Sequence, residues 1–175
     1  MADEKKPSKV EAGAQAGMEA AGGARLAREL LTRERVAVLA TVSERHGGGP
    51  FTSLAPFALT AAGDPILFLS ALSQHTRNLA ADPRASLFVH DPAAAAEDPR
   101  TAPRLALVGR VRPVPAADEP DARARYLARH PEARGLLNLD FALYVLSIEE
   151  AHLVGGFAAA GWIPGDALRG AFAAP

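Results

Sequence analysis

Five polar side chains gather where an apolar stretch of the sequence gives way to a short helical one. A helix N-terminus offers unsatisfied N–H groups and the positive end of the helix dipole, so hydroxyl and amide groups around it suit a phosphate. Ser73 is equally suited to be the N-cap of a helix that begins at Gln74. The residues alone leave capping and anion binding open. The group comprises Ser70, Ser73, His75, Thr76 and Asn78, within SALSQHTRN and ahead of the Asp82-Pro83 stop.

Ser53 and Leu54 lie in the middle of a second stretch of interest, PFTSLAPFAL. Pro56 follows two residues later, and a proline cannot donate a hydrogen bond to a sheet, so the stretch predicts an edge strand or a bulged one. Such an edge protects a sheet from aggregation. Alternatively, it is a seam of the fold where free backbone groups meet a flat ligand. Both interpretations remain open.

A third stretch, GGFAAAGW, places two glycines at the end of an apolar run and ahead of the only tryptophan. Gly155 and Gly156 would allow a ligand to approach the backbone closely, or would mark a bulge. Trp162 is suited to cover a cofactor, although the only tryptophan of a small protein more often belongs to the core or to an interface.

The composition excludes several kinds of chemistry. The chain of 175 residues has no cysteine, and its only lysines are Lys5, Lys6 and Lys9, which removes thiolate nucleophiles, cysteine-ligated metals and a P-loop from the folded part. The five histidines do not have the spacing of a zinc site, so we expect no metal site. A net charge of −1 gives no electrostatic basis for nucleic-acid binding. GxSxG and HExxH motifs are absent, so any catalysis would depend on a cofactor.

Hydrophobic periodicity and turn residues predict a flexible arm over residues 1–17, followed by one domain over 18–175. Successive hairpin-like connections favour a closed antiparallel β-barrel with flanking helices, an α+β fold made mainly of strands. Neither a signal peptide nor a membrane-spanning run is evident, so we expect a cytoplasmic protein without membrane contact. The expected elements are helices over 18–33, 74–81 and 120–138 (interrupted at Pro131), strands over 35–42, 51–59, 66–72, 84–91 and 104–114, a long loop over 91–103, and two strands within 141–157.

Four segments taken together resemble one family. The segments GGGPFTSLAPFAL, SALSQHTRNLAADPRASL and RYLARHPEA, with the terminal pair DFALYVL and LVGGF, look like the FMN-binding split-barrel proteins related to pyridoxamine 5'-phosphate oxidase. They are most similar to the haem-utilisation (HugZ-like) branch. The resemblance covers about residues 25 to 169. Each segment alone is weak, whereas their order and spacing are specific.

The resemblance implies a six-stranded split barrel that forms a homodimer, with FMN held at each subunit interface. It implies that Ser70, Ser73, His75, Thr76 and Asn78 surround the FMN phosphate, and that Ser53 and Leu54 lie along the isoalloxazine ring. Gly156 and Trp162 would approach from the C-terminal side, across the dimer. Haem is the alternative ligand that the HugZ-like branch implies.

The sequence also departs from the family pattern. Family oxidases carry Arg or Lys where this chain reads TSLAPFA, and a second basic pair where it reads HT. Neutral donors bind a phosphate less strongly than charged ones, so we expect modest flavin affinity and no pyridoxamine 5'-phosphate oxidase activity. Three hypotheses follow: an FMN-dependent oxidoreductase with a small-molecule substrate or electron donor, a haem-binding or haem-degrading protein, and a non-catalytic flavin carrier.

Overall fold

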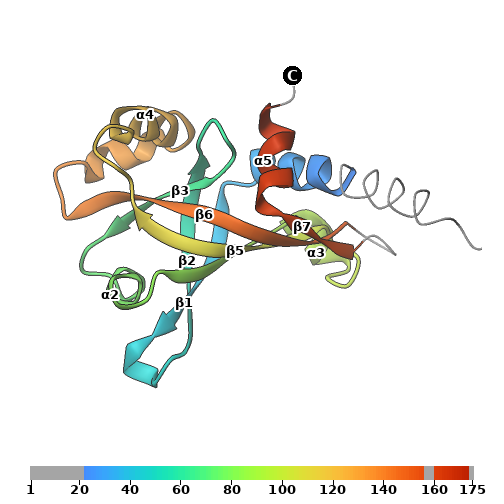
Figure 1. The fold of residues 1–175 in the computed structure, drawn as a ribbon, viewed down its shortest axis with the longest axis horizontal. Helices are drawn as coiled ribbons and strands as arrows, with labels where there is room; N and C mark the ends of the chain where they lie inside the picture. Colours follow the sequence, from blue (N-terminus) through green and yellow to red (C-terminus); the bar gives the residue numbers. More distant parts are fainter. Residues whose placement is uncertain (1–21, 156–159, 174–175) are drawn as a thin grey trace, which may run out of the picture.

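A computed structural model describes residues 22–155 and 160–173 (Figure 1). The predicted arm over residues 1–17 lies outside the described residues. An N-terminal helix over residues 22–33 precedes the strands. The further elements are β1 (Val36–Ser43), η1 (Glu44–His46), β2 (Gly49–Leu59), β3 (Pro65–Ser70), α2 (Gln74–Ala81), β4 (Arg84–His90), α3 (Pro92–Glu97), β5 (Arg104–Pro113), α4 (Glu119–Arg129), η2 (Pro131–Leu136), β6 (Phe141–Val154), β7 (Ala160–Pro164) and α5 (Gly165–Ala173).

The strands form the predicted six-stranded antiparallel barrel. Their order is β3-β2-β1-β4-β5-β6-β7, and an additional pairing of β3 with β6 closes the barrel, so that β7 is added outside the closed ring. Every pairing is antiparallel, as the succession of hairpins predicted.

Three sequence-based boundaries were wrong. The stretch 141–157 holds one long strand, β6, which pairs with β5 over most of its length and continues past a register shift opposite Val108 and Gly109. The stretch 91–103 is not all loop: Asp91 accepts hydrogen bonds from the N–H groups of Ala93 and Ala94 and starts the short helix α3. The strand predicted over 66–72 ends at Ser70. A side-chain cap and a short alanine run are weaker patterns than a periodic strand, which is why α3 was missed.

Strand β2 has different partners along its length, and this opens the barrel on one side. Residues 49–56 pair with β1, whereas only Phe57–Leu59 pair with β3. The first part of β2, which contains Ser53 and Pro56, is therefore hydrogen-bonded to a strand on one side only. The edge strand predicted from Pro56 is confirmed.

The main core fills the barrel and continues beneath two helices. Inward-facing leucines of the strands, such as Leu39, Leu87 and Leu107, are fully buried. The N-terminal helix adds Leu30 and Leu31 to the same cluster. Helix α5 lies beside the N-terminal helix (Figure 1), where Arg28 donates a hydrogen bond to the carbonyl of Ala171. A second, smaller apolar cluster around Phe68 and Tyr126 joins α4 and η2 to the barrel.

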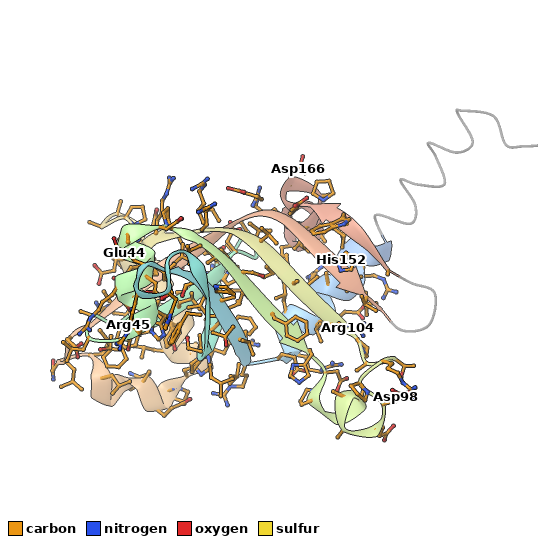
Figure 2. All side chains as sticks on the ribbon, turned by 90° about the horizontal axis from the view of Figure 1, so that it is seen from below. Glu44, Arg45, Asp98, Arg104, His152 and Asp166 are labelled. Carbon is orange, nitrogen blue, oxygen red and sulfur yellow. The ribbon has the colours of Figure 1, made fainter. Side chains whose placement is uncertain are left out.

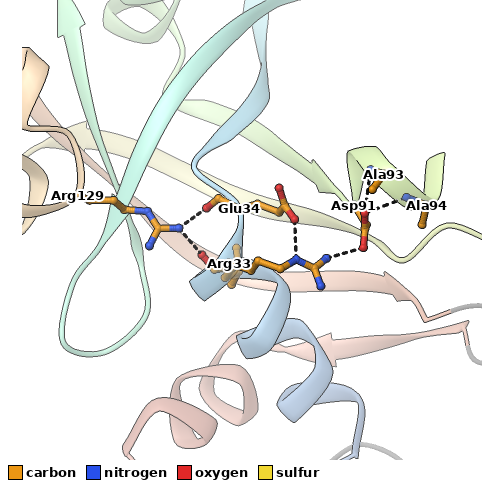
Figure 3. Close-up of polar contacts among 7 residues, drawn as sticks. Arg33, Glu34, Asp91, Ala93, Ala94 and Arg129 are labelled. Carbon is orange, nitrogen blue, oxygen red and sulfur yellow. Dashed lines mark hydrogen bonds and ion pairs between the residues drawn. The ribbon is translucent and has the colours of Figure 1, made fainter. Parts of the chain in front are cut away.

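Two arginines tie the N-terminal helix to α4 by capping each other's helix. The guanidinium of Arg129, at the end of α4, donates to the carbonyls of Leu31 and Glu34 at the end of the N-terminal helix (Figure 3). Arg35 donates in return to the carbonyl of Arg129 at 2.5 Å. These bonds satisfy carbonyls that a helix C-terminus leaves without partners. Arg129 also lies over the Phe57 ring, 5.6 Å from its centroid.

Arg129→Met should lower the free energy of unfolding by about 2–3 kcal/mol, because charge-assisted hydrogen bonds and a cation–π contact are lost together. Urea denaturation monitored by circular dichroism measures the change. Arg125→Met is the matched control on the same helix, since Arg125 makes a surface ion pair with Asp121. Its loss should cost about 0.5 kcal/mol or less. Equal effects of the two variants would contradict the capping role.

Candidate functional site

Helix α2 lies across the open side of the barrel and begins where the sequence predicted. Ser73 occupies the N-cap position with extended backbone, but its side chain makes no capping hydrogen bond. Ser73 is thus the N-cap residue of a helix that begins at Gln74, as one of the two open interpretations had it, but its hydroxyl takes no part in the cap. Because its hydroxyl does not cap the helix, Ser73 is available to a ligand at the start of α2.

Asn78 anchors α2 to β1 inside the protein. Its side-chain amide donates to the Thr41 hydroxyl oxygen at 2.9 Å, and it accepts from the Gln74 amide at 2.8 Å. Asn78 is only 1% exposed, and Thr41 is 3% exposed. A buried amide satisfied in this way fixes the helix on the sheet, so the geometry gives Asn78 a structural role beside its predicted role in cofactor binding.

Thr76 holds the start of α2 against the end of β3. Its hydroxyl donates to the carbonyl oxygen of Ser70 at 2.7 Å, and the side chain is buried. A threonine hydroxyl has one proton to donate. That proton is used inside the protein, so Thr76 would have to break this bond before donating to a phosphate.

His75 brings the two sequence-predicted stretches together. Its Nδ1 is hydrogen-bonded to the Ser53 hydroxyl of β2 at 2.9 Å. Its Nε2 is buried and has no partner among the described residues. Burial also lowers the pKa of His75 below its ordinary value, because desolvation disfavours the charged ring. At neutral pH the junction of β2 and α2 thus contains an uncharged imidazole with one ring nitrogen to satisfy.

Asp140 lies at the same junction, and sequence reasoning missed it. Its carboxylate accepts from the Ser70 hydroxyl at 2.5 Å and from the backbone N–H of Leu72 at 3.2 Å. These bonds, the serine contact most of all, lower the pKa of Asp140. Only the closing pair of strands, in which Ser70 faces Phe141, brings Asp140 here. In the sequence, Asp140 could have been noticed because it stands directly before a predicted strand that follows a loop.

The remaining predicted residues lie elsewhere in the described chain. Leu54 points outward from β2 and is 73% exposed. Trp162 is on β7 opposite His152, near the far end of β6 from the junction. Figure 1 places α2 and β7 at opposite ends of the molecule, and Figure 2 places His152 well away from Glu44 and Arg45 of the β1–β2 turn. Within one chain, Trp162 does not meet the junction. Gly156 lies outside the described residues.

A cavity of about 370 Å³ among the described residues does not coincide with the junction. It lies on the outer face of the sheet, and its lining includes Ala40, Ser86, Val108, Arg84 and Arg110. Arg84 and Arg110 are already paired with Asp82 and Glu149. We therefore place the candidate site at the junction, on the chemistry of its side chains, and not at this cavity.

A six-stranded antiparallel barrel of this topology, with a helix closing the gap beside a partly paired strand, defines the chain as a split-barrel protein. A family model for the CREG β-barrel matches residues 19–168. The chain therefore belongs to the CREG β-barrel family. This agrees with the resemblance to FMN-binding split barrels that the sequence indicated.

Three known proteins that are similar to this chain carry names that refer to haem. The non-canonical heme oxygenase HOZ of Arabidopsis thaliana is 35% identical over 135 residues, which is 76% of this chain and 40% of that protein. The structure of a heme-binding protein from Mycobacterium smegmatis is 31% identical, with a TM-score of 0.78 over 85% of this chain and 60% of that one. The heme storage protein HutZ of Vibrio cholerae is 26% identical, with a TM-score of 0.56 over 70% of this chain and 87% of that one.

The chain thus spans less than two thirds of the Arabidopsis and mycobacterial proteins.

Within residues 22–155 and 160–173, no helix combines the length and the apolar character needed to cross a membrane.

The lowered pKa of His75 predicts a pH dependence of stability. The unfolded chain takes up a proton near the ordinary histidine value of about 6.5, before the folded protein does. The contribution of neutral His75 is therefore complete above that pH and is lost as the pH falls towards the folded pKa. When the pH is lowered from about 7.5 to 5.5, the free energy of unfolding should therefore fall less in His75→Gln than in the wild type. Urea denaturation at each pH measures this difference.

His46→Gln is the control for this comparison, because His46 is exposed in the β1–β2 turn and should leave the wild-type slope unchanged. If His75→Gln kept the full wild-type loss of stability, the assignment of the pH dependence to His75 would be wrong.

Proposed function

We propose that this chain binds haem at the junction of β2, β3 and α2. The observation that carries the proposal is that the polar side chains expected around a phosphate make their hydrogen bonds inside the protein. Thr76 donates to Ser70, Asn78 donates to Thr41, and the Ser70 hydroxyl donates to Asp140. The names of the similar proteins from Arabidopsis, Mycobacterium and Vibrio give the proposal further support.

The apolar side chains near the junction suit a porphyrin better than a phosphate. Leu72 precedes α2 and is 71% exposed, and Leu139 precedes β6 and is 58% exposed. The two loops are in contact, since Ala71 N–H donates to the carbonyl of Asp140. When a flat apolar ring covers exposed leucines beside a site, the burial of their apolar surface favours binding.

His75 is the residue of this site whose chemistry fits a haem iron. A neutral imidazole is a common iron ligand, and a metal-bound histidine usually makes a hydrogen bond through its other nitrogen. His75 has this arrangement, with Nδ1 hydrogen-bonded to Ser53 and Nε2 without a partner in the part of the chain that the structure describes. Because Nε2 is buried, the first turn of α2 must shift before the ring meets an iron. Bound haem would supply redox-active iron, while Ser53 orients the ring and the leucines exclude water.

A second candidate is an FMN-dependent oxidoreductase that takes electrons from a reduced pyridine nucleotide, or a flavin carrier without catalysis. Two observations favour it. The Ser73 hydroxyl is not used in capping, and it stands at the positive end of α2. Arg77 is exposed on the same helix. Together they offer a phosphate a hydroxyl and a positive charge.

Titration with haemin and with FMN separates the two candidates. We expect a Soret band that shifts on binding haemin and remains through gel filtration, and weaker retention of FMN. His75→Ala should weaken haemin binding at least about tenfold, about 1.4 kcal/mol, and should change the position of the band. His46→Ala, in the exposed turn, should bind as the wild type does. A protein that retained FMN and ignored haemin would reject the haem proposal in favour of the flavin.

A homodimer is part of the proposed function, and the outer face of the sheet is the surface that suits it. Five strands beside β2 carry one cross-strand row of outward residues. Phe88 and Trp162 are exposed large apolar residues in this row. A long exposed apolar row of this kind is typical of a protein interface. The row consists of Leu54, Val38, Phe88, Ala106, His152 and Trp162.

Phe88→Glu should convert the dimer to a monomer, because it buries a charge in the middle of the interface without a partner. Size-exclusion chromatography with light scattering measures the mass. Ala124→Glu, on the exposed side of α4, introduces the same charge elsewhere and should remain dimeric. A monomeric wild type, or a Phe88→Glu protein that stays dimeric, would reject this interface.

A further inference from the structure

We propose that Asp140 is a specificity-determining residue that keeps phosphate groups out of the junction. Its carboxylate already lies where a ligand phosphate would be held, on the hydroxyl and N–H groups at the end of β3. The inference rests on the proposed function and deepens it: the ligand end that meets α2 carries no phosphate, as in haem or an unphosphorylated flavin.

The hydrogen bonds of Asp140 are those of a bound anion. One carboxylate oxygen, Oδ2, accepts from both the Ser70 hydroxyl, at 2.5 Å, and the Leu72 N–H, at 3.2 Å. The Ser70 oxygen accepts from the same Leu72 N–H at 3.1 Å, which closes a small ring of bonds just before α2. A hydroxyl and a backbone N–H directed at one oxygen form the local arrangement that proteins use for phosphate.

The charge of Asp140 opposes a second anion at this position. Its hydrogen bonds lower the pKa of its carboxyl, so the group is ionised at neutral pH. The hydrogen bond from the Ser70 hydroxyl is the largest cause of that lowered pKa, and backbone N–H groups add to it. A phosphate that entered would have to displace the Asp140 carboxylate from its hydrogen-bond donors. The phosphate would then lie beside the displaced carboxylate, and the two negative charges would repel each other.

The proposal predicts a gain of binding when the carboxylate is removed. The probe is inorganic phosphate, titrated into ¹⁵N-labelled protein against chloride of equal ionic strength. Asp140→Ala should show saturable shifts of the Leu72 and Gln74 amides, with phosphate bound at least about tenfold more tightly than by the wild type. Asp140→Asn keeps an acceptor but not the charge and should gain less. Removing Ser70 as well, in Ser70→Ala/Asp140→Ala, should reverse most of the gain.

Asp82→Asn is the matched control, because Asp82 lies at the other end of α2 and is bonded to Arg84. It removes the same charge and should gain no phosphate binding at Leu72. The proposal is overturned if the wild type binds phosphate at these amides as tightly as Asp140→Ala does. It is also overturned if Asp140→Ala gains nothing, or if Asp82→Asn gains as much.

Haemin titration of the same proteins keeps this result apart from the proposed function. If the wild type ignores haemin while Asp140→Ala gains phosphate, haem binding fails and the role of Asp140 stands. If the wild type binds haemin but Asp140→Ala gains no phosphate binding, haem binding stands and the role of Asp140 is rejected. The ¹⁵N spectrum itself reports whether each variant is folded, so loss of structure is not mistaken for loss of binding.

Discussion

The incomplete pairing of β2 is the constraint on which the site depends. Residues 49–56 are paired with β1 and Phe57–Leu59 with β3, so the ring is closed here by three residue pairs and leaves a gap beside the rest of β2. An unpaired edge exposes backbone groups and invites association with other chains. Pro56 blunts the edge, and α2 covers the opening beside it through contacts with β1 and β2. The junction that we assign as the site exists because this gap must be covered.

The way α2 is held decides which groups remain for a ligand. An apolar helix would cover the gap through side-chain burial, but the only large apolar residue that α2 buries is Leu79. Hydrogen bonds from His75, Thr76 and Asn78 to neighbouring elements supplement that contact. The polar residues that suggested an anion site in the sequence therefore serve first to attach the helix. Buried polar groups must be satisfied in this manner, since leaving one without a partner costs about 1–3 kcal/mol.

Local patterns predicted most of the fold, and long-range pairing accounts for what they missed. Alternation and turn residues located the barrel strands, and Asp82-Pro83 located the end of α2, because these features act within a few residues. The grouping of Ser53 with His75 followed only from a family resemblance, since the two residues are joined across 22 positions of sequence. Asp140 could not be predicted from its neighbours, because 70 positions separate it from Ser70 and only barrel closure joins them.

The chain on either side of helix α2 is tied to different strands of the barrel, which relates the site to the whole fold. Before the helix, Ser70 ends β3 and Asp140 directly precedes β6, and the pairing of these two strands closes the ring. After its end, the carbonyl of Pro83 accepts from the N–H of Val111 on β5. A shift of the first turn, as access to His75 requires, would therefore act on the closing strands before it reached β5. The hydrogen bond between Ser70 and Asp140 therefore lies both beside the strand pair that closes the barrel and at the start of the helix that covers the site.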